Sequence, residues 1–399
     1  MGRFSITRRN FIASVGATAV AAPLCTPAIA QGVKPIKIGL VTSLSGAYAG
    51  MGESMRAGLQ LFLAEQKNSF AGRPIELIVE DDQLKTDEGV RKFRKLIGQD
   101  NVDFICGVIS SGIALAIRDV VAESKTLTFI STGSANDLAR KAASPYIFRP
   151  TKTNWMLGST AGQWAADKVS KSGCLTLAAD YAAGREYVGD FVDSYQKLGG
   201  KVVKQVWAPL GTTDFAPILT TIAAEQPEFI YSFFASGDAV RFLQQFSDFR
   251  LGGKVKLVGT GALFDQEDVL PAVGDAALGG VSTYHQSPTA PASKAFAETY
   301  LKARGRLPGE ASSSGYATGQ VIKTALERVQ GDPSNKEKFR EAVLSGATDT
   351  IYGPMTFDPR NNQAILDIYV NEVRKGADGK PINTVIHTFK QVKDPGPGA

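Results

Sequence analysis

Histidine is scarce in this 399-residue sequence, which contains only His285 and His387. Two histidines exclude a three-histidine metal site, and no His-x-x-x-His spacing occurs. The sequence also has no Gly-Lys-Ser/Thr phosphate loop and no Gly-x-Ser-x-Gly nucleophile elbow. The segment GTGALF at 259–264 starts like a dinucleotide loop, but Phe264 stands where the third glycine belongs. The acidic triplet at 80–82 fits solvated carboxylates or a helix cap better than an acid pair. We therefore expect neither an enzyme nor a cofactor or metal.

Cysteine is also rare, with three in the chain. Cys25 lies in the N-terminal leader, and the residues before it match a lipid-attachment motif poorly. Cys106 and Cys174 each lie in a strand-like run. A cysteine in such a run is more often a small buried apolar residue than half of a disulfide. We expect both to be buried and unpaired.

Clusters of basic residues with interleaved aromatics are absent, although the formal net charge is +5. Part of that charge belongs to Arg3, Arg8 and Arg9 in the leader, which has no acidic residue. The small remaining excess does not favour nucleic acid, and we expect no such partner. A content of 43% hydrophobic and 21% charged residues is typical of a soluble globular protein with room for two domains.

The sequence has no apolar run long enough to span a bilayer. The apolar stretch in the leader, at 12–24, is too short to do so. The pair Arg8-Arg9 precedes it, and Ala28-Ile29-Ala30 follows as an A-x-A site. Residues 1–30 are therefore predicted to be an export signal cleaved near Ala30. The arginine pair resembles the twin-arginine signal, which implies export to the periplasm. An ordinary secretory leader, the alternative, would change only the route.

From Lys34 onward, short β-rich runs alternate with amphipathic segments of helical spacing, and the alternation restarts after residue 150. Such alternation is the signature of βαβ units. The fold class is therefore α/β, with two doubly wound parallel-sheet lobes and a crossing at 146–159. The third part of the chain is less regular. It predicts helices at 293–306, 313–330 and 335–346, a hairpin-like β segment at 352–375 and a frayed tail at 393–399.

Small polar residues follow two strands of the first lobe, at Ser110-Ser111-Gly112 and at 131–135. The carboxyl ends of parallel strands form the edge where doubly wound sheets bind ligands. Backbone N–H groups at such junctions favour negative charge, so the pair of loops predicts a carboxylate cradle. The alternative is that Ser111 and Asn136 or Asp137 only cap helices, and the sequence leaves both readings open.

Three aromatic residues, Tyr48, Tyr181 and Phe234, each occur at or just after a predicted strand end. They are positioned to wall an apolar ligand. Core packing is the ordinary alternative, above all for Phe234. Tyr181 lies in a polar stretch, where core packing is less natural.

With these residues in view, the chain resembles a type I periplasmic solute-binding protein of an ABC transporter, in the leucine/isoleucine/valine-binding branch. The blocks that carry the resemblance occur in the expected order along nearly the whole mature chain. They are IKIGLVTSLSGAYAGMGESMRAGLQLFL, ELIVEDDQ, YIFRPTKTN, DYAAGREYVGDF, TDFAPILTTI and DTIYGPMTFDPR.

The resemblance implies two lobes joined by a three-segment hinge, closing over a small ligand and presenting the closed form to a membrane permease. Lobe 1 would combine 34–150 with 284–352, and lobe 2 would combine 151–283 with 353–399. Binding would bias an open–closed equilibrium without making a bond. We expect a monomer. A sensor subunit for a membrane receptor is an alternative that the sequence does not separate from transport.

Carried onto this sequence, the family's carboxylate-binding groups fall on Ser110 or Ser111 and on the 132–135 loop. The acid that pairs with an amino-acid ligand's ammonium is missing, because Thr260, Gly261 and Ala262 occupy its place. An ammonium buried without a carboxylate is costly, although Asp238 or Asp265 could substitute. Small residues in EASSSGY would leave room for a larger ligand. The expected ligand-binding residues are Tyr48, Ser110, Ser111, Thr132, Gly133, Ser134, Ala135, Tyr181, Phe234 and Gly261.

These departures favour a small carboxylate ligand of the benzoate, hydroxybenzoate or phenylpropenoate type. Its acid group would lie on the two loops and its ring between the three aromatic side chains. A branched-chain amino acid or amide is the alternative ligand. An exported enzyme on a two-lobed scaffold is disfavoured by the scarcity of histidine and of reactive cysteine.

Overall fold

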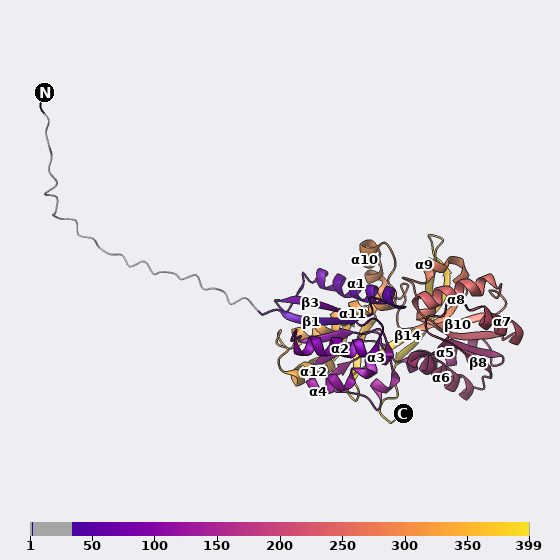
Figure 1. Ribbon diagram of the computed structural model, residues 1–399, viewed down its shortest axis with the longest axis horizontal. Coiled ribbons are helices and arrows are strands. Elements are labelled where there is room, and N and C mark those ends of the chain that lie inside the picture. The colour runs from indigo at the N-terminus through magenta and orange to yellow at the C-terminus, as the bar shows by residue number, and fades with distance from the viewer. Residues whose placement is uncertain (1, 3–33, 399) are drawn as a thin grey trace. The chain divides into compact units, whose positions relative to one another are not determined.

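The structure is a computed structural model that describes Gly2 and residues 34–398. Residues 35–398 form an α/β fold with two lobes, each built around one mixed, mainly parallel sheet. Figure 1 shows α1 to α4 with the first sheet and α5 to α8 with the second. The predicted fold class is confirmed, with the difference that both sheets contain antiparallel strands as well. The predicted export signal lies outside the described residues apart from Gly2.

The first sheet has the order β2-β3-β1-β4-β5-β6, and all its pairs are parallel except β2 with β3. Its central strands are buried over most of their length, which is why they read as continuous apolar runs in the sequence. The strands are β1 (Ile36–Thr42), β2 (Ser69–Phe70), β3 (Arg73–Asp81), β4 (Phe104–Gly107), β5 (Leu127–Ile130) and β6 (Ile147–Phe148). The early helices are α1 (Ala49–Glu65), α2 (Thr86–Gly98), α3 (Ser111–Ala116) and α4 (Arg118–Ser124).

The second sheet has the order β12-β13-β14-β11-β10-β9-β7-β8, with β15 also paired to β14. Strands β7 to β11 pair in parallel, and the strands from β12 onward add antiparallel neighbours. The strands are β7 (Cys174–Ala179), β8 (Val202–Ala208), β9 (Phe229–Phe233), β10 (Lys256–Thr260), β11 (Val281–Tyr284), β12 (Thr348–Thr350), β13 (Gly353–Asp358), β14 (Gln363–Lys375) and β15 (Pro381–Val392). The helices between β6 and β11 are α5 (Asn154–Lys168), α6 (Ala182–Lys197), α7 (Ala216–Glu225), α8 (Ser236–Asp248) and α9 (Leu270–Val273).

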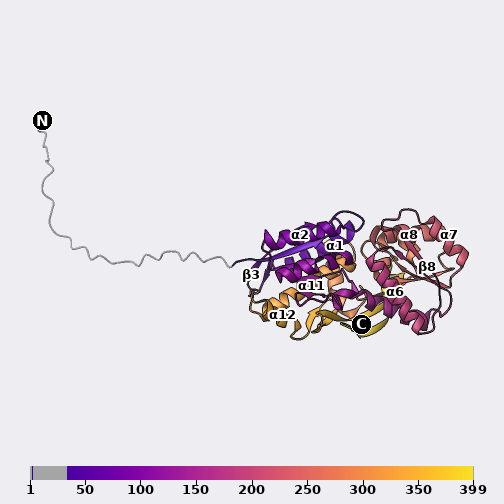
Figure 2. The same cartoon turned by 60° about the horizontal axis from the view of Figure 1, so that its bottom comes forward.

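The late helices include α10 (Lys294–Arg304), α11 (Glu310–Arg328) and α12 (Lys336–Leu344). Helix α11 returns to the first lobe and lies beside α1, as Figure 1 and Figure 2 both show. The rings of Phe62 on α1 and Tyr316 on α11 meet edge to face with centroids 5.0 Å apart. The hydroxyl of Thr318 lies 2.9 Å from that of Ser131, directly after β5. The irregular third part of the chain therefore completes the packing around the first sheet.

Two features of the C-terminal region differ from expectation. The segment 381–392, for which no strand was predicted, forms β15 and extends the second sheet. The tail predicted to fray is anchored, because the buried carboxylate of Asp394 accepts a hydrogen bond from Thr153 Oγ1 at 2.9 Å. The local sequence KDPGPGA could not predict this contact, because Thr153 lies more than two hundred residues earlier in the chain.

Both cysteines of the described chain are buried and free, Cys106 on β4 and Cys174 on β7. Their predicted state is confirmed. Burial raises the pKa of the Cys106 thiol to about 12, so the group stays neutral at physiological pH. Within residues 34–398, no helix is both long and apolar enough to cross a membrane.

The contact between α1 and α11 leaves no room for a side chain at Gly58. A Cβ atom there would lie 1.9 Å from the Ser312 carbonyl oxygen of α11. We expect Gly58→Ala to lower the free energy of unfolding by about 1–3 kcal/mol, because the helices must separate. Urea denaturation measures the change. The matched control is Gly98→Ala on α2, where a Cβ meets nothing within 4 Å. Equal stabilities of the two variants would contradict the close approach of the helices.

Candidate functional site

A cavity lies where the carboxyl ends of strands from both sheets meet. Residues that follow β4, β5, β7, β9 and β10 line it, as expected for the ligand edge of doubly wound sheets. Its volume of about 30 Å³ holds little more than a water molecule. Small-molecule sites have roughly 300 Å³ or more, so a ligand must separate the walls to enter. The walls are Tyr48, Met51, Ile109, Ser111, Thr132, Ser134, Lys152, Tyr181, Ala183, Tyr187, Phe233, Ala235, Ala262 and Glu310.

The two small-residue loops of the first sheet are bonded to each other. Ser111 Oγ accepts a hydrogen bond from the Ser134 N–H at 3.2 Å. A Cβ at Gly133 would lie 3.0 Å from the Ser110 carbonyl oxygen, so glycine permits the loops to approach. Ser110 Oγ accepts from the Ile113 N–H at 3.5 Å and caps α3. The capping role therefore applies to Ser110, whereas Ser111 lines the cavity.

The loop after β5 leaves one hydroxyl without a partner. Thr132 Oγ1 is buried, lines the cavity and has no hydrogen bond within the described chain. Ser134 also lines the cavity, but its Oγ donates to Asn154 Oδ1 at 2.6 Å. Ala135 lies away from the cavity wall, and its carbonyl accepts from Arg149 Nη1 at 2.8 Å. Thr132 is thus the side chain of this loop best placed to meet a ligand.

Aromatic side chains from both lobes also line the cavity. Tyr48 precedes α1 and Tyr181 precedes α6, and their hydroxyl oxygens are 3.2 Å apart. Phe233 packs against Tyr181 and Tyr187, with ring centroids 6.0 and 4.6 Å apart. Burial raises the pKa of Tyr48 and Tyr181, so both phenols remain neutral hydrogen-bond donors.

Phe234 is not part of this wall. Its ring packs in the core of the second lobe against Phe215 and Phe242, with centroids 5.1 and 5.2 Å away. Successive side chains of an extended segment point to opposite sides, so the cavity receives the preceding residue, Phe233. The position of Phe234 at a predicted strand end indicated an aromatic wall, but the neighbouring Phe233 is the ring that lines the cavity.

Two charged residues in the cavity were not anticipated. Lys152 lies in the crossing between β6 and α5, and Glu310 is the first residue of α11. They form an ion pair between Lys152 Nζ and Glu310 Oε1, and the two residues are only 1% and 4% exposed. The lysine also donates to the Thr132 carbonyl oxygen at 3.5 Å. Because the partners are 158 residues apart in sequence, no local pattern could join them.

The expectation that the site lacks an acid is therefore corrected. Gly261 lies outside the cavity wall, and a Cβ there would be 2.2 Å from the Tyr284 ring, which fills the space. The two suggested substitutes are also absent from the wall. Asp238 accepts from the Gly211 N–H at 2.9 Å, and Asp265 accepts from the Glu310 N–H at 2.7 Å. The carboxylate in the cavity comes from α11 instead.

The acidic triplet at the end of β3 differs from the predicted solvated group or helix cap, because Glu80 and Asp82 are buried and the residue that caps α2 is Lys85. Glu80 pairs with Lys92 and Lys95 of α2. Asp81 accepts from the Leu44 N–H at 2.8 Å, and the Asp82 carboxylate accepts from Ser43 Oγ. These bonds hold the loop after β1 and lie outside the cavity wall.

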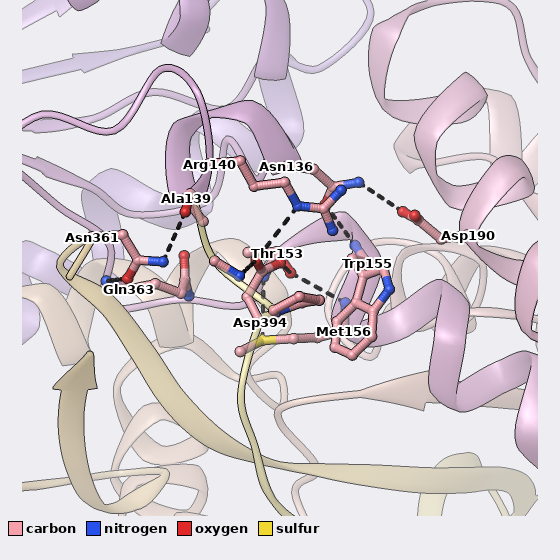
Figure 3. A network of polar contacts seen from close by, with 12 residues as sticks. Asn136, Ala139, Arg140, Thr153, Trp155, Met156, Asp190, Asn361, Gln363 and Asp394 are labelled. Atoms are coloured by element: carbon pink, nitrogen blue, oxygen red, sulfur yellow. Dashed lines mark hydrogen bonds and ion pairs between the residues drawn. The ribbon is translucent and has the colours of Figure 1, made fainter. Parts of the chain in front are cut away.

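A polar network next to the cavity links its loops to the crossing and to the second lobe (Figure 3). Asn136 Oδ1 accepts from the Trp155 N–H at 2.7 Å, and Asn136 Nδ2 donates to Asp190 on α6 at 2.8 Å. Arg140 lies 3.5 Å from Asp394, which also binds Thr153. The β5 loop is thus tied to the start of α5, to α6 and to the C-terminal tail.

Comparisons with known proteins agree with this architecture. The family model for periplasmic binding proteins matches residues 35–380. An ABC transporter substrate-binding protein from Sphaerobacter thermophilus is 34% identical with a TM-score of 0.84, covering 90% of this chain and 99% of its own. A solute-binding protein from Rhodopseudomonas palustris, solved in complex with 3,4-dihydroxybenzoic acid, is 29% identical with a TM-score of 0.85, at 90% and 99% coverage.

Another relative is named for a different kind of ligand. The Leu/Ile/Val-binding protein homolog 6 of Brucella melitensis is 27% identical over 368 residues, which are 90% of this chain and 93% of its own.

Asp190, which belongs to the network in Figure 3, should make the stability of the fold depend on pH. Burial raises the pKa of Asp190 from 3.8 to about 7, with like charges at Glu186 and Asp394 adding to the effect. A raised carboxyl pKa stabilises the fold at low pH, and that stabilisation is lost as pH rises from about 4 to about 7. We expect the wild type to lose up to about 1.4 kcal/mol of unfolding free energy per pH unit in this window relative to Asp190→Asn.

Asparagine at position 190 can still accept the Asn136 hydrogen bond, so the comparison isolates the charge. Urea unfolding of both proteins at pH values from 4 to 8 measures the difference. Stability curves that run parallel across this window would show that Asp190 titrates normally.

Proposed function

Because this chain belongs to the periplasmic binding protein family and is the solute-binding protein of an ABC transporter, we propose that it captures a small aromatic carboxylate by closure of its cleft. The observation that carries the proposal is that two unlike sets of groups line one cavity. Ser111 and Thr132 contribute polar groups from the loops after β4 and β5, and Tyr181 lies in a cluster of aromatic rings. Such a lining matches a molecule with an acid group at one end and an apolar ring at the other.

In the bound state, the acid group lies on the loops at Ser111 and 132–134, and the ring lies against Tyr48, Tyr181 and Phe233. Tyrosine and phenylalanine contribute buried area and favour edge-to-face contact with an aromatic ligand. The ligand of the Rhodopseudomonas palustris relative, a dihydroxybenzoic acid, supports this choice of chemical class.

A branched-chain amino acid or amide is the second candidate. It is favoured by the carboxylate of Glu310 in the cavity and by the name of the Brucella melitensis relative. However, the rings of Tyr48, Tyr181 and Phe233 suit an aromatic ring better than a short aliphatic side chain. The aromatic acid is therefore the better fit.

Capture works through the equilibrium between open and closed forms. The Tyr48–Tyr181 contact joins the two lobes across a cavity too small for an aromatic acid, so entry requires the lobes to separate. The ligand then favours closure by bridging both walls. The proposal includes the lobes 34–150 with 284–352 and 151–283 with 353–399, a monomer, export to the periplasm, and an inner-membrane permease as partner.

A thermal-shift panel tests the ligand class. Benzoate, 4-hydroxybenzoate, 3,4-dihydroxybenzoate and 4-hydroxycinnamate are compared with leucine, valine and leucinamide. We expect at least one aromatic acid to raise the melting temperature, since a ligand at a hundred times its Kd adds about 2.7 kcal/mol to stability. If only leucine, valine or leucinamide raises it, the ligand class is wrong and the second candidate holds.

A further inference from the structure

We infer that Lys152 is the cation that binds the ligand's carboxylate and that Glu310 is a positioning residue, its counter-ion in the empty site. This inference rests on the proposed function, because it assigns the group that meets the acid end of the ligand. Of the described residues that line the cavity, Lys152 is the one cation and Glu310 the one anion. The resemblance to known binding proteins pointed to loop hydroxyls and N–H groups and gave no role to either residue.

The burial of the pair explains why the two charges must occur together. A lone ammonium at 1% exposure loses nearly all its hydration, which costs far more than one hydrogen bond returns. Lys152 therefore needs an anion whenever the site is empty and closed. Glu310 supplies it, held in place because its N–H donates to Asp265 Oδ2 at 2.7 Å. Its position at the N-terminus of α11 also favours the carboxylate.

The hydrogen-bonding capacity of the ammonium leaves one donor for a ligand. An ammonium has three donors, and Lys152 uses two of them, on Glu310 Oε1 and on the Thr132 carbonyl. Thr132 Oγ1 on the same loop is buried and also lacks a partner among the described residues. A ligand carboxylate has two oxygens and accepts from both groups, so it satisfies two donors of the wall at once.

This arrangement sets the charge of the ligand. The site is neutral when empty, and its remaining strong donor is cationic. A monoanionic acid gains the interaction with Lys152, whereas its neutral amide gains only ordinary hydrogen bonds.

The test compares benzoate with benzamide, two ligands of the same shape and different charge, by isothermal titration. The wild type is expected to bind benzoate at least 100-fold more tightly. The double variant Lys152→Gln/Glu310→Gln replaces the ion pair with two neutral amides and avoids leaving a lone buried charge. We expect it to fold, with the preference for benzoate reduced to less than 10-fold. Glu310→Gln alone retains Lys152 and should keep the preference.

The matched control is Lys168→Gln/Asp167→Asn, which likewise replaces both members of an ion pair with neutral amides, at an exposed position of α5 outside the cavity wall. It is expected to leave both affinities unchanged. An undiminished preference in the double variant would overturn the role of Lys152. A loss in Glu310→Gln as large as in the double variant would overturn the assignment of roles within the pair.

Failure of the inference and failure of the proposed function give different results. If the wild type binds leucine in place of aromatic acids, the aromatic ligand is wrong. The same variants then test Lys152 with leucine and leucinamide. If the wild type binds no carboxylate, both the ligand class and the role of Lys152 are rejected.

Discussion

The meeting of strand ends from two sheets in one cavity is the constraint on which the rest of this structure depends. Parallel strands place all their carboxyl ends at one edge, and the residues that follow β4, β5, β7, β9 and β10 converge there. Because backbone groups at these ends are not consumed by the sheet, the loops must satisfy one another. The bond from the Ser134 N–H to Ser111 Oγ is one result. The few groups left over define what the cavity offers to a ligand.

Those remaining groups come from several elements. Thr132 Oγ1 on the first lobe has no partner within residues 34–398, and the ion pair joins Lys152 of the crossing to Glu310 of α11. On the second lobe, tyrosine and phenylalanine rings pack closely and present little besides hydroxyl tips. The charged groups and most of the aromatic rings therefore belong to different elements around one cavity. Under the proposed function, a ligand that contacts both sets would hold the lobes together.

Several predictions from the sequence rest on local patterns and agree with the structure. The apolar runs predicted the central strands, because strands buried on both faces require continuous hydrophobic sequence. The small residues after β4 and β5 lie together at the sheet edge as expected, although Ser110 caps a helix and Ala135 turns away. The aromatic wall was expected at Phe234 and includes Phe233 instead, since alternation along an extended segment decides the direction by a single residue. The binding roles of these residues stay predictions.

The sequence by itself determined the α/β class, the buried and unpaired state of both cysteines and the edge at which a ligand site should form. Each of these follows from local periodicity or from the chemistry of one residue type. Only the tertiary structure decided which acid and which base enter the cavity. Glu310 reaches it because α11 returns to pack on α1, and Lys152 reaches it from the crossing between lobes. Likewise, Asp394 is anchored by a threonine from the far half of the chain. Pairing of buried charges depends on desolvation at a shared location, and no spacing along the sequence encodes that location.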